Sequence, residues 1–341
     1  MSDLDVEALA RWLDANAVGE RGAPITTTPI AGGASNEIFD VRRGEDRMVL
    51  RMAPATSSPD RHRSMLREYQ VLRALDGTDV PHAAAIASCA DPAVLGGTFV
   101  LMAYVDAWSP MTTDGWPAPF DTDLSARHGL GIQLVDGIAR LARVDWRARG
   151  LDGFGKPDGF HERQVDRWVG HLSDVRTREL PGFDEAAQWL RTKRPQHYEP
   201  GIMHGDYQFA NVMFEHGAPA RLAAIVDWEM TTVGDPLLDL GWVMTGWPAD
   251  DAEPTGPSYV DYTGLPTRSE LLEHYSTVSG RPVDDVDYYV VLARFKLAAV
   301  LEARYSRWVA SGADNPKVEA FGPVVLGLTQ SAAELARSTT I

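Results

Sequence analysis

The order of strand-like and helix-like segments constrains this fold most strongly. Strand patterns bounded by turn residues cluster near the start of the chain, at 25–30, 37–42, 48–52 and 96–105. A short helix around 9–13 precedes them, and short strands return at 201–229. Helical patterns fill most of the rest, at 60–76, 124–144, 161–175, 183–190, 235–246 and 285–310. Strands that precede most of the helices predict an α+β fold with a small antiparallel sheet first.

A boundary between two lobes is predicted near residue 106. The stretch DAWSPMTTDGWPAPF, residues 106–120, holds three prolines and no hydrophobic periodicity. A chain of 341 residues with 44% apolar content is also too long for one small core. We therefore predict an N-lobe over 1–105, with a sheet and a helix, and a mainly helical C-lobe over 106–341.

Composition limits the partners of this chain. The formal net charge is −16, so the surface repels nucleic acid and anionic membranes. The same charge either attracts a cationic substrate or serves solubility alone. A single cysteine, Cys89, excludes an internal disulfide. The acidic N-terminus is unlike a signal peptide, and no apolar run approaches the ~18 residues of a membrane span, so we expect a cytosolic protein.

The stretch HGDYQFANVMF, residues 204–214, holds the strongest chemical signal. Asp206 supplies a carboxylate that can take a proton from a hydroxyl and orient its oxygen. Asn211 follows five residues later. Within AAIVDWE, residues 223–229, an apolar strand ends at Asp227. Carboxylate and amide oxygens are ligands that Mg²⁺ prefers. One base and two metal ligands predict a phosphoryl-transfer site.

These motifs resemble those of the aminoglycoside phosphotransferase-like kinases. HGDYQFAN is similar to their HGDxxxxN catalytic loop, and IVDWE to their metal-binding motif. DWEMTTVGDPLLDLGW, residues 227–242, resembles the branch that includes kinase domains joined to acyl-CoA dehydrogenases. The resemblance covers about residue 25 to the last long helix. It implies a two-lobed protein-kinase-like fold, ATP and Mg²⁺ as cofactors, and a small-molecule hydroxyl as acceptor.

Roles in the catalytic loop follow from this resemblance. Asp206 would be the catalytic base, and His204 would brace the loop around it. Asn211 and Asp227 would hold Mg²⁺ on the ATP phosphates.

The resemblance also assigns nucleotide-binding residues to the N-lobe. Arg51 would bind phosphate in place of the lysine of most kinases, and Glu68 would either pair with it or lie on a solvated helix face. The backbone of Ala103 and Val105 would bond adenine, with Met102 behind it. The segment AGGASN would either cover the phosphates or form only a hairpin turn, and its assigned residues are Gly32, Gly33, Ser35 and Asn36.

Several further residues stay open from the sequence alone. Asp235 and Asp239 would either bind metal or act structurally, with Asp239 accepting bonds from catalytic-loop backbone and Asp235 capping a helix. Glu229 would either approach a second metal or face solvent. A set of tryptophans would either line an apolar acceptor pocket or pack in the core: Trp108, Trp116, Trp168, Trp228, Trp242, Trp247 and Trp308.

Three functions compete at this stage. The first is a kinase for a hydroxyacyl-CoA or related hydroxylated metabolite, which the acyl-CoA dehydrogenase branch favours. The second is an aminoglycoside kinase, which the acidic charge favours but the details of the motifs do not. The third is a nucleotide-binding pseudokinase that regulates a partner, and the intact Asp206, Asn211 and Asp227 argue against it.

Overall fold

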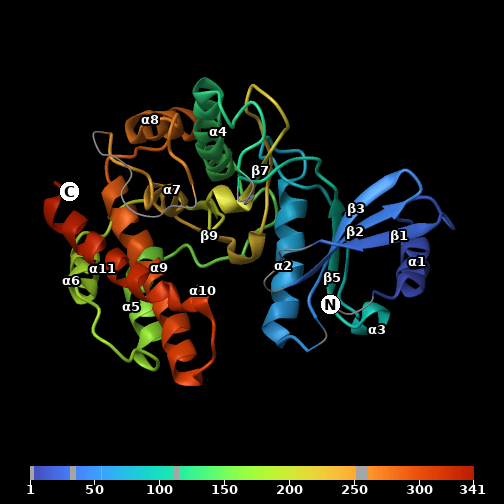
Figure 1. The fold of residues 1–341 in the computed structure, drawn as a ribbon, viewed down its shortest axis with the longest axis horizontal. Helices are drawn as coiled ribbons and strands as arrows, with labels where there is room; N and C mark the ends of the chain where they lie inside the picture. Colours follow the sequence, from blue (N-terminus) through green and yellow to red (C-terminus); the bar gives the residue numbers. More distant parts are fainter. Residues whose placement is uncertain (1–3, 31–35, 55, 111–114, 251–259) are drawn as a thin grey trace.

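The computed structural model describes residues 4–30, 36–54, 56–110, 115–250 and 260–341, and it confirms the α+β class. A five-stranded antiparallel sheet with strand order β1-β2-β3-β5-β4 forms the N-terminal part (Figure 1). Its strands are β1 (Ile25–Pro29), β2 (Glu37–Arg43), β3 (Asp46–Met52), β4 (Ala85–Cys89) and β5 (Phe99–Ala103). Helices α1 (Val6–Ala15), α2 (Pro59–Leu75) and α3 (Pro92–Leu95) accompany the sheet.

The register of the β2–β3 hairpin decides which side chains of the sheet face the helical part. Gly44 turns the chain with a φ of +56°, a conformation that glycine adopts freely. Because side chains alternate along a strand, Phe39 and Leu50 point to one face, where they pack with Leu9 and Leu13 of α1. Arg51 therefore points to the opposite face, toward α2 and the helical part.

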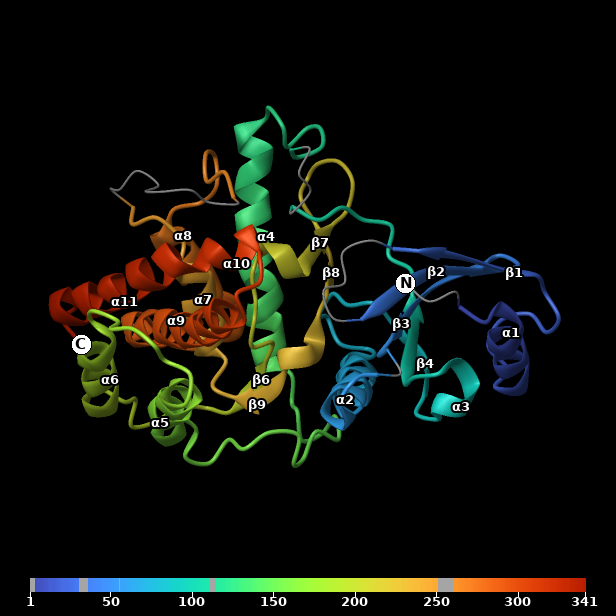
Figure 2. The same cartoon turned by 60° about the horizontal axis from the view of Figure 1, so that its bottom comes forward.

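Helix α2 lies between the sheet and the helical part in both views (Figures 1 and 2). Its buried residues Met65, Leu72 and Leu75 belong to the same apolar cluster as Leu134 of the helical part. Because one core runs through both parts, α2 fixes the sheet relative to the loops of the helical part.

The C-terminal part is built around α9, whose buried residues face several neighbours at once. It packs against α5, α6, α7 and α11, as expected of a helix that is apolar on most sides. The helices of this part are α4 (Leu124–Arg143), α5 (Phe160–Ser173), α6 (Phe183–Thr192), α7 (Leu237–Met244), α8 (Arg268–Ser279), α9 (Val286–Ser311), α10 (Pro316–Glu319) and α11 (Phe321–Ser338).

Two short antiparallel strand pairs carry the loops that the motifs occupy. Strand β6 (Gly201–Met203) pairs with β9 (Thr232–Gly234), and β7 (Val212–Phe214) pairs with β8 (Leu222–Ile225). Short 3-10 turns, η1 (Phe209–Asn211) and η2 (Trp228–Met230), lie between them. Strand β6 leads into residues 204–208, and β8 leads into residues 226–227. The two pairings therefore bring the HGDYQFAN and IVDWE motifs close together.

Most elements predicted from the sequence are present, with ends that move by a few residues. The strand predicted over 96–105 is shorter because Gly96, with a φ of +85°, ends α3. Five elements were not predicted: β4, α3, α8, α10 and α11. In the part of the chain that the structure describes, no helix is long and apolar enough to cross a membrane.

Candidate active site

The catalytic loop begins at a glycine that no other residue could replace without strain. Gly205 has a φ of +87°, and a Cβ placed there would lie 2.5 Å from the carbonyl oxygen of Met230. The buried Asp239 carboxylate accepts the backbone N–H of His204 at 2.6 Å and that of Gly205 at 2.8 Å. Burial raises the pKa of Asp239 to about 6, and these two bonds oppose the rise.

The structural interpretation of the GDPLLDL segment is thereby confirmed. Asp239 holds catalytic-loop backbone, as the second alternative predicted. Asp235 accepts the N–H of Leu237 at 3.1 Å in the first turn of α7, and its other oxygen bonds to His161 and Tyr289. Both carboxylates are buried and accept hydrogen bonds from protein donors.

His204 is completely buried and braces the loop from inside. Its Nε2 donates to the carbonyl of Val226 at 2.9 Å, so it ties the catalytic loop to the residue before Asp227. Burial lowers the pKa of His204 to about 4, which keeps the ring neutral at physiological pH. This geometry agrees with the bracing role that the sequence suggested.

Asp206 projects from the loop with both carboxylate oxygens oriented by neighbours. Gln208 donates to Oδ1 at 3.0 Å, and the Asn211 amide nitrogen donates to Oδ2 at 3.2 Å and to the Asp206 carbonyl at 2.8 Å. Burial raises the pKa of Asp206 above the ordinary value for aspartate. A base with a raised pKa takes up a proton more readily. Gln208 was not predicted as part of this arrangement.

Asp227 and Asn211 lie side by side because the Val226 N–H donates to the Asn211 carbonyl at 2.9 Å. Asp227 has a φ of +64°, an uncommon backbone conformation outside glycine that recurs at functional sites. The Asp227 side chain is 41% exposed, and the Asn211 amide nitrogen is engaged by Asp206, which leaves the amide oxygen for a ligand.

These two oxygen donors fit a Mg²⁺ site that water and substrate complete, and they are too few for a site formed by protein ligands alone. Mg²⁺ in phosphoryl-transfer sites takes one or two protein ligands, and water and substrate phosphate supply the rest. Among the residues that the structure describes, no group of three or more His, Cys, Asp or Glu side chains could hold a metal. An Asn–Asp pair beside an open cavity is the donor set of such a site.

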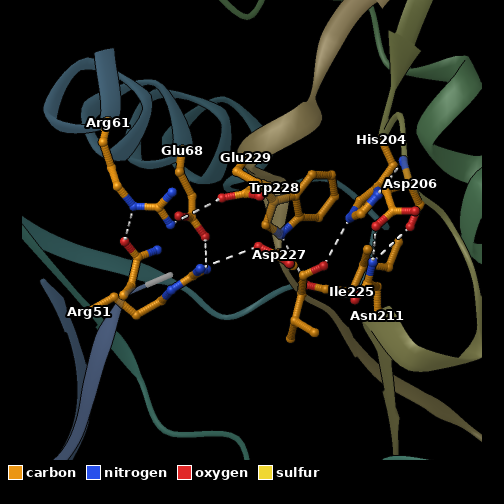
Figure 3. Close-up of polar contacts among 12 residues, drawn as sticks. Arg51, Arg61, Glu68, His204, Asp206, Asn211, Ile225, Asp227, Trp228 and Glu229 are labelled. Carbon is orange, nitrogen blue, oxygen red and sulfur yellow. Dashed lines mark hydrogen bonds and ion pairs between the residues drawn. The ribbon is translucent and has the colours of Figure 1, made fainter. Parts of the chain in front are cut away.

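Arg51 connects the sheet to Asp227 in the segment after β8 (Figure 3). One guanidinium nitrogen bonds to Glu68 of α2, and the other lies 3.3 Å from Oδ1 of Asp227. Glu68 is 2% exposed, which excludes the solvated-face alternative. Burial raises the pKa of Glu68 to about 7, and the Arg51 charge opposes that rise. Within the described ranges no acceptor pairs with the buried Nε of Arg51, which suits an anionic ligand.

Arg61 of α2 forms a second link to the same region and was missed by the sequence analysis. Its Nε donates to the Asn36 side chain at 3.1 Å, and its guanidinium lies 3.7 Å from the Glu229 carboxylate (Figure 3). Glu229 is 37% exposed, which agrees with the solvent-facing alternative, and its ion pair with Arg61 was not predicted.

The phosphate-covering segment is only partly described. Gly32, Gly33 and Ser35 lie outside the described residues, so their assignment stays a prediction. Asn36, which is described, lines the cavity next to β2.

A cavity of about 810 Å³ joins these groups, within the range of small-molecule sites. Arg51, Asn211 and Asp227 are among its lining residues. Ala103, Val105 and apolar side chains from both parts also line it, namely Val49, Leu72, Met102, Met213 and Ile225. The Ala103 N–H donates to the Ala84 carbonyl at 2.9 Å, so its carbonyl is the group left for a ligand. Asp206 adjoins the cavity through its contact with Asn211.

Aromatic residues next to the catalytic loop pack mostly as core. Trp108 and Trp247 are 7% and 6% exposed, and Trp247 stacks on Phe209 with ring centroids 6.1 Å apart. Trp116 lies at the edge of this group, 6.4 Å from Trp108. The core interpretation is therefore confirmed for Trp108 and Trp247.

Solved structures share this fold. A crystal structure of a putative aminoglycoside phosphotransferase from Ralstonia eutropha superposes with a TM-score of 0.85 and 28% identity, over 99% of this chain and 100% of that one. Macrolide 2'-phosphotransferase MphH from Brachybacterium faecium gives a TM-score of 0.59 at 18% identity, over 98% of this chain and 100% of that one. The fold is the two-lobed protein-kinase-like fold, as predicted.

Fold and site together define the class of small-molecule phosphotransferases that act on hydroxyl groups. The model of the phosphotransferase enzyme family matches residues 26–274, well over half of the chain, and the chain belongs to this family.

Curated relatives bear out the branch suggested by the sequence. Acyl-CoA dehydrogenase family member 10 of Mus musculus is 28% identical over 97% of this chain, and member 11 of Homo sapiens is 26% identical over 98%. The match covers 30% and 43% of those proteins, so this chain spans less than half of their length.

Proposed function

We propose that this enzyme uses ATP and Mg²⁺ to phosphorylate a hydroxyl group of a small molecule. One observation carries the proposal. The Asn211–Asp227 oxygen pair and the Arg51 guanidinium line a single cavity, and the Asp206 carboxylate adjoins it through its hydrogen bond with Asn211. A base, a site for a divalent cation and a phosphate-binding cation are the parts that phosphoryl transfer requires.

The nucleotide would lie between the two lobes. Residues 1–105 would cover it as the N-lobe, with 106–341 as the C-lobe beneath. The Ala103 carbonyl and Val105 N–H would bond adenine against Met102, and the segment holding Gly32, Gly33, Ser35 and Asn36 would cover the phosphates. Arg51, held in place by Glu68, would bind a phosphate oxygen.

Asp206 would act on the acceptor. Its carboxylate, oriented by Gln208 and Asn211, would accept the hydroxyl proton and direct the oxygen toward the phosphorus. Asn211 and Asp227 would hold Mg²⁺, which, when bound, neutralises charge on the phosphates. His204 and Asp239 would keep the loop in the geometry that places Asp206.

A hydroxyacyl-CoA or a related hydroxylated metabolite is the acceptor that we favour. Support comes from the relatives, whose names are those of acyl-CoA dehydrogenase family members and which align along nearly the whole of this chain. An aminoglycoside is the second candidate. The net charge of −16 favours a cationic acceptor, and the similar Ralstonia protein is called a putative aminoglycoside phosphotransferase.

A screen of Mg·ATP consumption separates these acceptors. The purified chain is incubated with hydroxyacyl-CoAs, aminoglycosides, and sugar or amino alcohols, and phosphorylated products are identified by mass spectrometry. We expect a phosphorylated hydroxyacyl-CoA that is absent with Asp206→Asn. Phosphorylated aminoglycoside alone would select the second candidate. Tight Mg·ATP binding without any product across the screen would leave the pseudokinase as the better interpretation.

A further inference from the structure

A lysine lies buried beneath the catalytic loop, in a helix that has no part in the proposed chemistry so far. Lys296 of α9 is 5% exposed and stands among the apolar residues Phe295, Ala298 and Ala299. A buried ammonium group is costly unless hydrogen bonds and opposite charges compensate it. Its position therefore calls for specific partners.

Those partners are parts of the active site. The Nζ of Lys296 donates to the carbonyl of Gly205 at 2.5 Å and lies 4.4 Å from the ring centroid of Trp242 in α7. The carboxylates of Asp206 and Asp239 are close enough to interact with its charge. Helix α9 packs against α7, which carries both Asp239 and Trp242, so the lysine is held rigidly.

The bond from Lys296 completes a clamp on one glycine. The N–H of Gly205 donates to Asp239, and its carbonyl accepts from Lys296, so the residue is fixed from both sides. That carbonyl belongs to the peptide group that leads directly into Asp206. A rotation of this peptide plane would move the Asp206 carboxylate, and displacements of about 1 Å at a reacting group can cost about 10²-fold in rate.

We propose that Lys296 is a positioning residue for phosphoryl transfer, whose ammonium group locks the Gly205–Asp206 peptide so that the Asp206 carboxylate meets the acceptor hydroxyl. The inference rests on the proposed function of Asp206. It assigns Lys296 no contact with nucleotide, since Lys296 is not among the residues that line the described cavity. Loss of the ammonium should therefore lower turnover and leave nucleotide binding alone.

Two loss variants and one charge-retaining variant test the proposal. Lys296→Met keeps the length and volume of the side chain, Lys296→Gln keeps a donor without the charge, and Lys296→Arg keeps the charge. Arg294→Met is the control, because Arg294 lies two residues before Lys296 on the same helix and, among the described residues, donates to the carbonyls of Ser331 and Thr245 at 3.0 and 3.4 Å. Lys296 is buried and Arg294 is partly buried, so Arg294→Met controls for the loss of a long cationic side chain from the same stretch of α9.

Three quantities are measured on each folded variant. With the best acceptor of the screen, kcat should fall by at least ~10-fold in Lys296→Met while the Kd of Mg·ADP stays within about twofold. Lys296→Arg should regain part of the loss, and Arg294→Met should keep the parent kcat. Hydrogen–deuterium exchange of 204–211 should be faster in Lys296→Met and unchanged in Arg294→Met, because only the former frees the Gly205 peptide.

The outcomes separate this inference from the proposed function. An active parent with an equally active Lys296→Met would overturn the role of Lys296 and leave the proposed function intact. A parent that phosphorylates no acceptor would overturn the proposed function, and exchange then decides about Lys296. Unchanged exchange over 204–211 in Lys296→Met, or in Lys296→Gln if the methionine variant does not fold, would show that the lysine does not hold the loop.

Discussion

Arg51 and Asp227 lie 176 positions apart in the chain, and their side chains meet at 3.3 Å between Nη2 and Oδ1. The contact joins β3 of the sheet to the segment after β8 of the helical part. Glu68 holds the other guanidinium nitrogen, so Arg51 is fixed at the cavity by partners on both sides. If Arg51 binds phosphate as proposed, the cation is in position before the ligand arrives.

The first prediction concerns this arginine. Arg51→Ala should weaken ATP binding by about 10–10²-fold, because a charge-assisted hydrogen bond contributes about 1.5–3 kcal/mol. Arg51→Lys should recover part of the loss, since a point charge still attracts phosphate. Isothermal titration with Mg·ATP measures both affinities. ATP binding by Arg51→Ala equal to that of the parent would remove Arg51 from the phosphate site.

The second prediction concerns the metal. ATP should raise the melting temperature more in the presence of Mg²⁺ than in EDTA, because a ligand that binds only the folded state stabilises it by mass action. Asp227→Asn should abolish most of this difference, since it removes the negative charge from the donor pair. Thermal unfolding with and without EDTA is the measurement. The same ATP shift under both conditions would exclude Asn211 and Asp227 as metal ligands.

From the sequence alone we could predict the parts of the site whose residues lie close together in the chain. His204, Asp206 and Asn211 share one loop, and Asp227 follows β8 closely. The spacing within the loop and the end of the apolar run before Asp227 therefore predicted that these residues lie close together. Contacts between distant segments had no such signal. The link from Arg61 to Glu229 depends on the docking of α2 onto the helical part, which no local pattern encodes.

The sequence around Lys296 holds a weak indication of a buried functional cation, which the sequence analysis did not use. Lys296 is a single cation inside the apolar stretch FKLAAVL, residues 295–301, where a buried helix face would otherwise be expected. Among the missed elements, α11 contains Gly322, Pro323 and Gly327, residues that favour a loop in any local analysis. Its Pro323 lies in the first helical turn, where proline needs no hydrogen bond. Strand β4, with the sequence AIASC, has weak strand propensity and forms because β5 is beside it.

The third prediction concerns stability and pH. Burial lowers the pKa of His204 from 6.5 to about 4. Between these values the unfolded chain binds a proton that the folded protein does not, so the free energy of unfolding falls as the pH drops from 6.5 toward 4. This group alone contributes up to about 1.4 kcal/mol per pH unit. Glu68 and Asp239, whose pKa values are raised by burial, act in the opposite direction.

A variant isolates the contribution of His204. His204→Gln keeps a donor for the Val226 carbonyl but does not titrate, and Glu68 and Asp239 remain in both proteins, so their effects cancel in the difference. Urea unfolding at pH 7, 6 and 5 should show the parent losing its stability advantage over His204→Gln on acidification. A difference that stays constant over this range would mean that His204 is protonated in the folded state as readily as in the unfolded chain.

The last prediction separates the base from the metal ligand. Asp206 adjoins the cavity through Asn211 and holds neither the metal nor Arg51, so its proposed role is limited to the acceptor hydroxyl. Asp206→Asn should therefore leave ATP affinity almost unchanged and lower kcat by about 10²–10⁴-fold, the usual contribution of a positioned general base. Asp227→Asn should impair both, because Asp227 lies within the cavity beside Arg51.

The two variants form a matched pair, since each replaces a carboxylate by an amide of the same shape. Nucleotide titration beside product formation with the screened acceptor gives both quantities for each protein. Equal losses of affinity in the two variants would place Asp206 at the nucleotide, contrary to its hydrogen bonds with Gln208 and Asn211. Full phosphoryl-transfer activity in Asp206→Asn would show that the acceptor hydroxyl loses its proton without this carboxylate. Another group in or near the cavity would then orient the acceptor.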